Sequence, residues 1–202
     1  MINFSHVVRQ GYTVNSHGYR APEFSTVDWN DSYIIQGCSA VFGLGIPNDL
    51  QTVSACLSEM LNYSVINLGV AGASIQLQYL NAIEILEQGF RPKGVFVVWP
   101  NADRYPLIRN GIITNVGPWS DTKELDWMLE DNSKNHNVYH ARAYKLLWEL
   151  ANVPVYEISH HAHNTFCKEQ ITEYLDKGDD GEHWGPITAL AVANRLYKQV
   201  NK

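Results

Sequence analysis

The sequence is poor in cysteine, with three residues in a chain of 202. Cys38, Cys56 and Cys167 are odd in number and widely spaced, so neither a disulfide framework nor a zinc site of the CxxC type can be drawn from them. This cysteine usage favours a reducing compartment. The first ten residues also lack a basic start followed by an apolar run, so we expect no cleaved signal and a cytoplasmic location.

Excess positive charge and long apolar runs are also missing. The formal net charge is −6 and the sequence pI is near 5.7. This charge argues against a nucleic-acid-binding domain, because such domains usually carry a basic patch that binds the phosphate groups. The longest apolar stretches, such as residues 95–100, are far too short for membrane insertion. The charge and the short apolar runs thus exclude two broad classes of partner, nucleic acids and the membrane interior.

Internal repeats, low-complexity tracts and runs of like charge are absent as well, so nothing marks a linker between domains. Apolar residues make up 45% of the chain and charged residues 18%, a balance that supports a sizeable core. The sequence therefore predicts a single domain over residues 1–202, with the weakly patterned residues 1–30 wrapping its outside.

What the sequence does contain is an alternation of short β-rich runs with amphipathic helical stretches, typical of a parallel sheet with helices. The unbroken apolar run at 94–99 predicts a central strand that is covered on both faces. Residues 100–116 show little periodicity and predict an irregular segment. The other expected strands are 33–36, 64–68 and 153–158, and the expected helices are 50–61 (with a capping box at Asn48 and Gln51), 74–86 (capped by Ser74), 121–129, 139–150 and 186–200.

Four short sequence blocks lie where ligands bind in such folds, beyond the carboxyl ends of parallel strands. Three of them follow the first three predicted strands, at residues 37–45, 67–74 and 100–104, and the fourth, at 180–186, precedes the last helix. These blocks, in this order over residues 33–195, resemble those of the SGNH hydrolases, also called GDSL-like esterases. Residues 15–20 also resemble a short motif that precedes the first block in some members.

The resemblance implies an α/β fold: a three-layer α/β/α sandwich with a flavodoxin-like parallel sheet of four or five strands. It implies a serine hydrolase without metal or cofactor, with Ser39 as nucleophile, His183 as general base and Asp180 as the group that orients His183. The same resemblance assigns the oxyanion hole to the backbone N–H groups of Ser39 and Gly72 and to the side-chain amide of Asn101. This set is chemically coherent, because a serine hydroxyl needs a positioned base and a tetrahedral intermediate needs preorganised donors.

The first block departs from the family pattern at Cys38, where the family usually has Asp. That Asp is a supporting residue outside the triad, so we expect altered hydrogen bonding around the site with the reaction retained. A second interpretation makes Cys38 itself a nucleophile. Side-chain alternation at the end of a strand directs Cys38 away from Ser39, which favours Ser39.

Several other residues allow two interpretations. Arg104 and Tyr105, just beyond Asn101, are candidates for substrate binding, while a structural ion pair would equally explain Arg104. His160, His161 and His163 suggest a metal site, but neighbouring histidines in a loop point in different directions and no further ligand stands at a suitable spacing, so we expect a loop at the rim of the site. The Trp and Tyr residues between Trp99 and Trp148 are expected in the core, with a platform for a sugar as the alternative. Arg20, in the segment 15–20, stays undecided.

The expected function is hydrolysis of a short acyl ester through a Ser39 acyl-enzyme. The resemblance makes an O-acetyl group on a carbohydrate a frequent substrate, so the expected partner is a small-molecule or carbohydrate ester. Acyl transfer to an acceptor other than water uses the same residues. A binding module that kept the fold and lost turnover is the alternative that Cys38 suggests, with Ser39 as a turn or capping serine and Asn101 satisfying backbone groups. The sequence indicates no oligomeric state.

Overall fold

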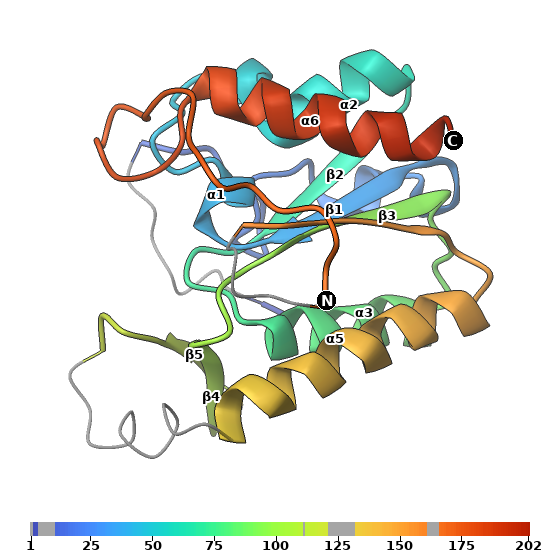
Figure 1. Ribbon diagram of the computed structural model, residues 1–202. Coiled ribbons are helices and arrows are strands. Elements are labelled where there is room, and N and C mark those ends of the chain that lie inside the picture. Colours follow the sequence, from blue (N-terminus) through green and yellow to red (C-terminus); the bar gives the residue numbers. More distant parts are fainter. Residues whose placement is uncertain (1, 4–10, 111, 121–131, 161–165) are drawn as a thin grey trace.

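A parallel β-sheet lies at the centre of the molecule. The computed structural model describes residues 2–3, 11–110, 112–120, 132–160 and 166–202 (Figure 1). The sheet has four strands in the order β2-β1-β3-β6, all parallel. Their bounds are Tyr33–Gly37 for β1, Val65–Gly69 for β2, Gly94–Trp99 for β3 and Val155–Ser159 for β6. The predicted sheet is confirmed with four strands.

Helices cover both faces of this sheet, which completes three layers (Figure 1). On one side lie α2 (Val53–Leu61) and α6 (Pro186–Val200), and on the other α3 (Ile75–Glu87) and α5 (Asn132–Leu150). Every residue of β2 and β3 is buried, as expected for strands covered on both faces. The predicted three-layer α/β/α architecture is therefore confirmed. None of the helices in the described part of the chain has the length and apolar character needed to cross a membrane.

Capping side chains mark the starts of α2 and α3. Ser74 Oγ accepts a hydrogen bond from Leu77 N at 3.1 Å at the start of α3, as predicted. The predicted capping box at Asn48 was wrong. Asn48 instead caps the short 3-10 helix η3 (Asp49–Gln51), and Thr52 caps α2 by accepting from Ala55 N at 3.3 Å. The α-helix consequently begins three residues later than its first expected residue.

Residues 100–116 are not the irregular segment that the sequence predicted. They contain an antiparallel hairpin of β4 (Tyr105–Arg109) and β5 (Ile112–Val116), in which Arg109 pairs with Ile112. Two residues, Asn110 and Gly111, stand between these strands, and Asn110 has a φ of 51°. Asn-Gly is a strong signal for a two-residue hairpin, and it was the signal that could have found these strands. The predicted helix at 121–129 lies outside the described residues.

The structure differs from two further expectations, on the start of α5 and on the N-terminal segment. Helix α5 begins at Asn132 and not at residue 139. The N-terminal segment also does more than wrap the outside, because Tyr19 and Trp29 are buried core residues and Arg20 is almost fully buried. This segment contains two short 3-10 helices, η1 (Phe24–Thr26) and η2 (Trp29–Asp31). The Tyr19 ring packs against Phe24 of η1, and the Tyr19 hydroxyl donates to Asn81 Oδ1 at 3.2 Å. Local periodicity is weak here because these residues are buried singly.

The expectation of aromatic residues in the core holds for part of the range from Trp99 to Trp148, since Tyr105 is only half-buried and Trp119 and Tyr139 are exposed. Trp99, Trp148, Trp184 and Tyr144 are fully buried. Trp99 packs edge to face on Tyr144, with ring centroids 5.1 Å apart. Trp119 differs from them, since 54% of it is exposed and it lies at the mouth of the pocket described next.

Candidate active site

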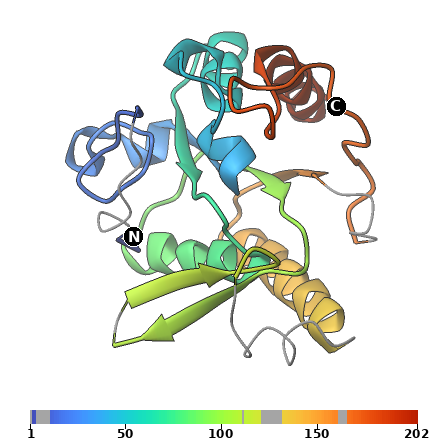
Figure 2. The same ribbon diagram turned by 90° about the vertical axis from the view of Figure 1, so that its left-hand side faces the viewer.

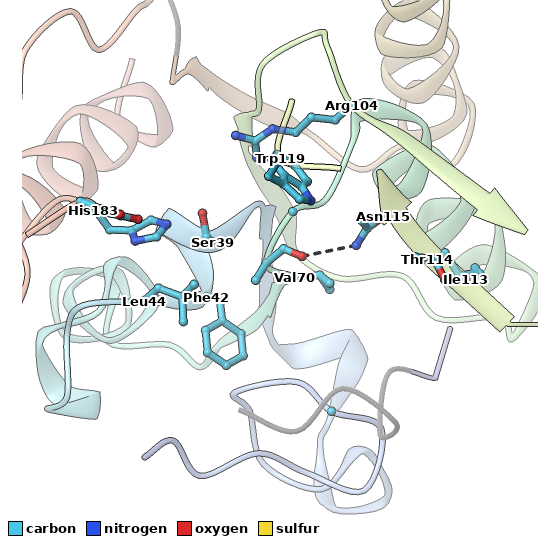
Figure 3. Close-up of a pocket in the computed structure, with 14 residues that line it drawn as sticks. Ser39, Phe42, Leu44, Val70, Arg104, Ile113, Thr114, Asn115, Trp119 and His183 are labelled. Atoms are coloured by element: carbon cyan, nitrogen blue, oxygen red, sulfur yellow. Dashed lines mark hydrogen bonds between the residues drawn. The ribbon is translucent and has the colours of Figure 1, made fainter. Parts of the chain in front are cut away.

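Ser39 stands at the first position of α1 (Ser39–Phe42), a short helix that follows β1 directly. Its side chain caps nothing, because Cys38 occupies the N-cap position and the Ser39 hydroxyl makes no hydrogen bond with the described residues. The hydroxyl instead faces a pocket of about 550 Å³, which His183 also lines (Figure 3). A volume of this size is within the ordinary range for small-molecule sites.

Three side chains from distant parts of the sequence hold α1 in place. A helix this short leaves its last carbonyl groups without internal partners. Trp184 Nε1 donates to Ala40 O at 3.0 Å, Asn67 Nδ2 to Val41 O at 2.9 Å, and Arg20 Nη1 to Gly43 O at 2.8 Å. The position of Ser39 therefore depends on the N-terminal segment, on β2 and on the loop before α6.

The Arg20 guanidinium has a structural role that the sequence left open. Its Nε donates to Asp49 Oδ1 at 2.6 Å, and its Nη2 donates to Pro47 O at 3.3 Å. Its Cζ lies 4.8 Å from the ring centroid of Tyr12, and the Tyr12 hydroxyl accepts a hydrogen bond from Gly45 N at 2.9 Å. Arg20 thus fixes the chain that leaves α1.

Asp180 and His183 form a hydrogen-bonded pair in the loop before α6. His183 Nδ1 and Asp180 Oδ2 are 2.7 Å apart, and Asp180 Oδ1 accepts from the backbone N–H groups of Glu182 and His183, each at 3.0 Å. Partial burial alone would raise the pKa of Asp180, but these hydrogen bonds and the nearby imidazole outweigh it and hold that pKa below its ordinary value. The pair leaves Nε2 of His183 as the ring nitrogen that can act on Ser39.

This loop packs directly on the first block. Asp179 N donates to Gly45 O at 2.8 Å, and Gly178 N donates to His183 O at 2.9 Å within the loop. Gly45 has a φ of 78°, and a Cβ placed on it would lie 2.8 Å from Asp180 Oδ1. The absence of a side chain at Gly45 therefore leaves room for Asp180 in the position where it contacts His183.

The backbone donors expected for an oxyanion hole are available. Gly72 lines the pocket and has a φ of 75°, in the left-handed region that a turn residue without Cβ adopts readily. The N–H groups of Ser39 and Gly72 donate to none of the described residues. Both can therefore donate to a ligand oxygen beside the Ser39 hydroxyl.

Asn101, the third expected donor, is placed differently. Its Oδ1 accepts from Ala102 N at 3.0 Å, and its Nδ2 donates to Asp103 Oδ2 at 2.8 Å. Among the described residues, those that line the pocket include Ser39, Gly72 and His183 but not Asn101. The structure thus brings Asp180, His183, Ser39 and Gly72 together and turns the Asn101 amide toward Asp103.

Of the two residues expected to bind substrate, Arg104 lines the pocket and Tyr105 begins β4 outside the lining. The hairpin contributes a wall that the sequence analysis missed, and Trp119 follows it. Figure 3 shows Arg104, Trp119 and the hairpin on the side of the pocket across from Ser39 and His183. The wall residues from the hairpin are Ile113, Thr114 and Asn115, and the apolar residues near Ser39 are Phe42, Leu44 and Val70.

Cys38 and the histidine cluster have other surroundings. The Cys38 side chain is fully buried and outside the pocket lining, which agrees with the expectation that it points away from Ser39. His160 Nε2 lies 2.7 Å from the Tyr174 hydroxyl. His161 and His163 lie outside the described residues, and within the described ranges no three His, Cys, Asp or Glu side chains gather as a metal site would require.

Solved structures provide the comparison at this point. Esterase EstA from Pseudoalteromonas sp., in a structure inhibited by monoethylphosphonate, matches 85% of this chain and 97% of its own with a TM-score of 0.51 at 12% identity. TesA matches 84% of this chain and 95% of its own with a TM-score of 0.53 at 14% identity. The chain has the SGNH hydrolase fold. A lipolytic protein of the G-D-S-L family from Desulfitobacterium hafniense matches 84% of this chain and 99% of its own, with a TM-score of 0.39 at 15% identity.

Sequence comparison adds nothing to this result, since neither the protein-family models nor the curated protein sequences gave a match. The SGNH hydrolase fold accounts for the position of the pocket. In Figure 2, which looks onto the carboxyl ends of the strands, the short helix α1 lies between the chain before α6 and the hairpin. Identities of this order relate the fold of this chain to that of esterases, and the activity has to be argued from its own residues.

Proposed function

We propose that the protein is a serine esterase that hydrolyses a short acyl ester through a covalent intermediate on Ser39. The observation that carries this proposal is the Asp180–His183 hydrogen bond of 2.7 Å, with His183 and the Ser39 hydroxyl lining one pocket. Nucleophile, base and orienting carboxylate are the three groups that this reaction requires.

The proposed reaction begins when His183 Nε2 takes the proton of the Ser39 hydroxyl while Oγ attacks the carbonyl carbon of the ester. Asp180 holds the imidazole through Nδ1 and stabilises the imidazolium. The negative charge on the former carbonyl oxygen is stabilised by the N–H groups of Ser39 and Gly72. Collapse of this intermediate breaks the ester C–O bond, and His183 returns its proton to the departing alcohol.

Hydrolysis of the acyl-enzyme follows the same route with water as nucleophile. His183 accepts a proton from the water as its oxygen attacks the acyl carbon, and the bond to Ser39 Oγ then breaks. The proton goes back to Ser39, and the carboxylic acid leaves as the second product. The apolar side chains of Phe42, Leu44 and Val70 near Ser39 suit an acyl group of few carbons.

Asn101 enters this proposal as a third oxyanion donor, although its side chain lies outside the pocket lining, so its amide would have to turn toward Ser39 when the substrate binds. An amide nitrogen carries two hydrogens, so the bond from Nδ2 to Asp103 leaves one hydrogen for the substrate oxygen. The bond from Ala102 N to Oδ1 fixes which end of the amide is the donor end. Asp103 and Ala102 would then act as positioning residues for Asn101.

Labelling with a fluorophosphonate probe tests the proposal. The folded wild-type protein should be labelled once, and Ser39→Ala should lose both the label and the hydrolysis of p-nitrophenyl acetate. Ser64→Ala is the matched control, because Ser64 is exposed and far from the pocket lining, and it should keep both. Cys38→Ala should also keep the label.

Failure of the folded wild type to react with the probe would overturn the esterase proposal and favour a binding module. A panel of esters with acyl chains of increasing length, together with acetylated sugars, then defines the substrate. Product analysis in the presence of alcohols separates hydrolysis from acyl transfer, because a transferase forms the new ester.

A further inference from the structure

The pocket contains a guanidinium group with buried donors that have no acceptor. Arg104 lines the pocket with 14% of its side chain exposed. Its Nε and Nη1 atoms are buried and make no hydrogen bond with the described residues. Leaving the donors of a mostly buried cation unpaired is unfavourable, so an anionic group bound against the part of this guanidinium that faces the pocket would stabilise it.

The neighbouring carboxylate does not supply them. Asp103 Oδ1 is 3.9 Å from Arg104 Nε, which is beyond hydrogen-bonding distance. The other carboxylate oxygen of Asp103 accepts from Asn101 Nδ2. The charge of Arg104 is therefore partly balanced by Asp103, while its hydrogen-bonding capacity is retained.

Trp119 holds the guanidinium in this position. Arg104 Cζ lies 5.1 Å from the ring centroid of Trp119, and the indole in turn lies against Gly72, where a Cβ would come within 3.2 Å of it. Stacking on an aromatic face fixes the plane of a guanidinium and leaves the donors at its edge available. Figure 3 shows the Arg104 side chain extending over Trp119 toward the side of the pocket that holds Ser39.

Charge is distributed unevenly around the pocket. Glu182, which is next to His183 in the sequence, and Arg104 are the residues of opposite charge that line it. The chain as a whole carries a net charge of −6, so an anion would be repelled from most of the surface. Arg104 is the charged group that would orient such a ligand in the pocket.

We propose that Arg104 binds an anionic oxygen group of the substrate, a carboxylate or a phosphate, so that the enzyme prefers esters carrying a negative charge beyond the scissile bond. This inference rests on the esterase function proposed above. The edge of a guanidinium donates two parallel hydrogen bonds to such a group, and the charge strengthens both. Arg104 would thereby set the end-to-end orientation of the ester beside Ser39.

Pairs of esters that match in size and differ in charge test this inference. In each pair, one ester carries a free carboxylate group beyond the scissile bond, and the other carries a neutral carboxamide group in its place. A third ester that carries a phosphate group distinguishes the two kinds of anion. The wild type should hydrolyse the anionic member with the higher kcat/KM. Arg104→Gln should lower kcat/KM for the anionic ester by about 10–100-fold and change it by less than about threefold for the carboxamide.

Two further variants make the result specific. Arg104→Lys keeps the charge but not the planar pair of donors, so it should retain part of the preference. Arg142→Gln removes the same charge from an exposed position on α5 and should leave the preference unchanged. Equal kcat/KM for the two members of a pair in the wild type, or equal losses for both in Arg104→Gln, would overturn the inference.

Binding to Ser39→Ala separates this inference from the proposed activity. Calorimetry with this variant should show tighter binding of the anionic ester than of the carboxamide, and the difference should fall as salt is added. Fluorophosphonate labelling without any charge preference overturns the role of Arg104 and leaves the esterase. A charge preference in binding without labelling of the wild type overturns the esterase and leaves the anion site.

Discussion

Trp184 Nε1 donates a hydrogen bond to the Ala40 carbonyl oxygen at 3.0 Å, and both residues are buried. Trp184 follows the candidate base His183, and Ala40 follows the candidate nucleophile Ser39. This bond therefore joins the two segments that carry the reacting groups, although they are 144 residues apart in the sequence. In this arrangement Trp184 would act as a positioning residue, since its side chain is fully buried and outside the pocket lining.

Trp184→Phe keeps an aromatic ring in the core and removes the indole N–H, which leaves the Ala40 carbonyl oxygen unpaired. We expect the free energy of unfolding to fall by about 1–3 kcal/mol. We also expect kcat for the best ester to fall by about tenfold with KM changed less than about twofold, because the His183 ring shifts relative to Ser39. Steady-state kinetics and urea unfolding measure the two effects.

Trp148→Phe is the matched control for that variant. Trp148 is equally buried but lies on α5, outside the pocket lining, so its replacement should reduce stability and leave kcat unchanged. An equal fall of kcat in both variants would show that the Trp184 hydrogen bond has no positioning role.

Asn101→Ala should lower kcat by about 10²–10³-fold if the amide donates to the oxyanion. Asp103→Asn should lower kcat by a smaller factor, because the amide stays in place but loses the carboxylate that orients Nδ2. Both variants are measured with the same ester at saturation. A decrease of less than threefold for Asn101→Ala would remove Asn101 from the oxyanion hole and leave the two backbone donors.

Gly45→Ala should impair catalysis as well as stability. An alanine at this position has to keep the left-handed backbone conformation, which lowers the free energy of unfolding by about 1–2 kcal/mol. Its methyl group would also push on Asp180 Oδ1. Gly89→Ala is the control, because Gly89 has a similar φ of 81° with no atom within 4 Å of a new Cβ. Thermal unfolding should show a loss in both variants, and kcat should fall only in Gly45→Ala. Full kcat in Gly45→Ala would show that the contact with Asp180 is dispensable.

Asp176 links stability to pH. Burial alone would raise the pKa of this carboxyl, but hydrogen bonds from Ile187 N at 2.9 Å and Thr188 N at 2.8 Å, at the start of α6, together with the Thr188 hydroxyl, hold that pKa below its ordinary value. A lowered pKa in the folded state stabilises above the unfolded value of about 3.9, and this contribution disappears as the pH falls through the folded value. The free energy of unfolding should therefore decline below about pH 4.

Asp176→Asn should be less stable than the wild type by about 1 kcal/mol at neutral pH, since a neutral amide caps the helix less well. The same variant should show a shallower decline of stability below about pH 4, and urea unfolding at a series of pH values measures both. Asp179→Asn changes an exposed carboxylate of the same loop and should resemble the wild type. An unchanged acid decline in Asp176→Asn would assign the pH dependence to other carboxyl groups.

The elements that could be predicted were those with local signals. The strand at 94–99 is a continuous apolar run, and the strand at 33–36 is apolar up to Gln36. The start of α3 is marked by Ser74, which accepts a hydrogen bond from a residue three positions away. The hairpin had a local signal too, the Asn110-Gly111 pair, which the low periodicity around it obscured. The start of α2 was misplaced because Asn48 and Thr52 both have capping side chains, and the two helices that they cap are only a few residues apart.

The sequence by itself determined the alternation of strands and helices and the four blocks, including the Asp180–His183 spacing that allows a contact across one turn. The tertiary structure alone decided that Arg20, Asn67 and Trp184 hold α1, and it turned the Asn101 amide toward Asp103 while Arg104 faces the pocket. The physical reason is the range of the interactions. Periodicity and capping act between near neighbours in the chain, whereas the direction of a side chain depends on packing against residues that folding brings together.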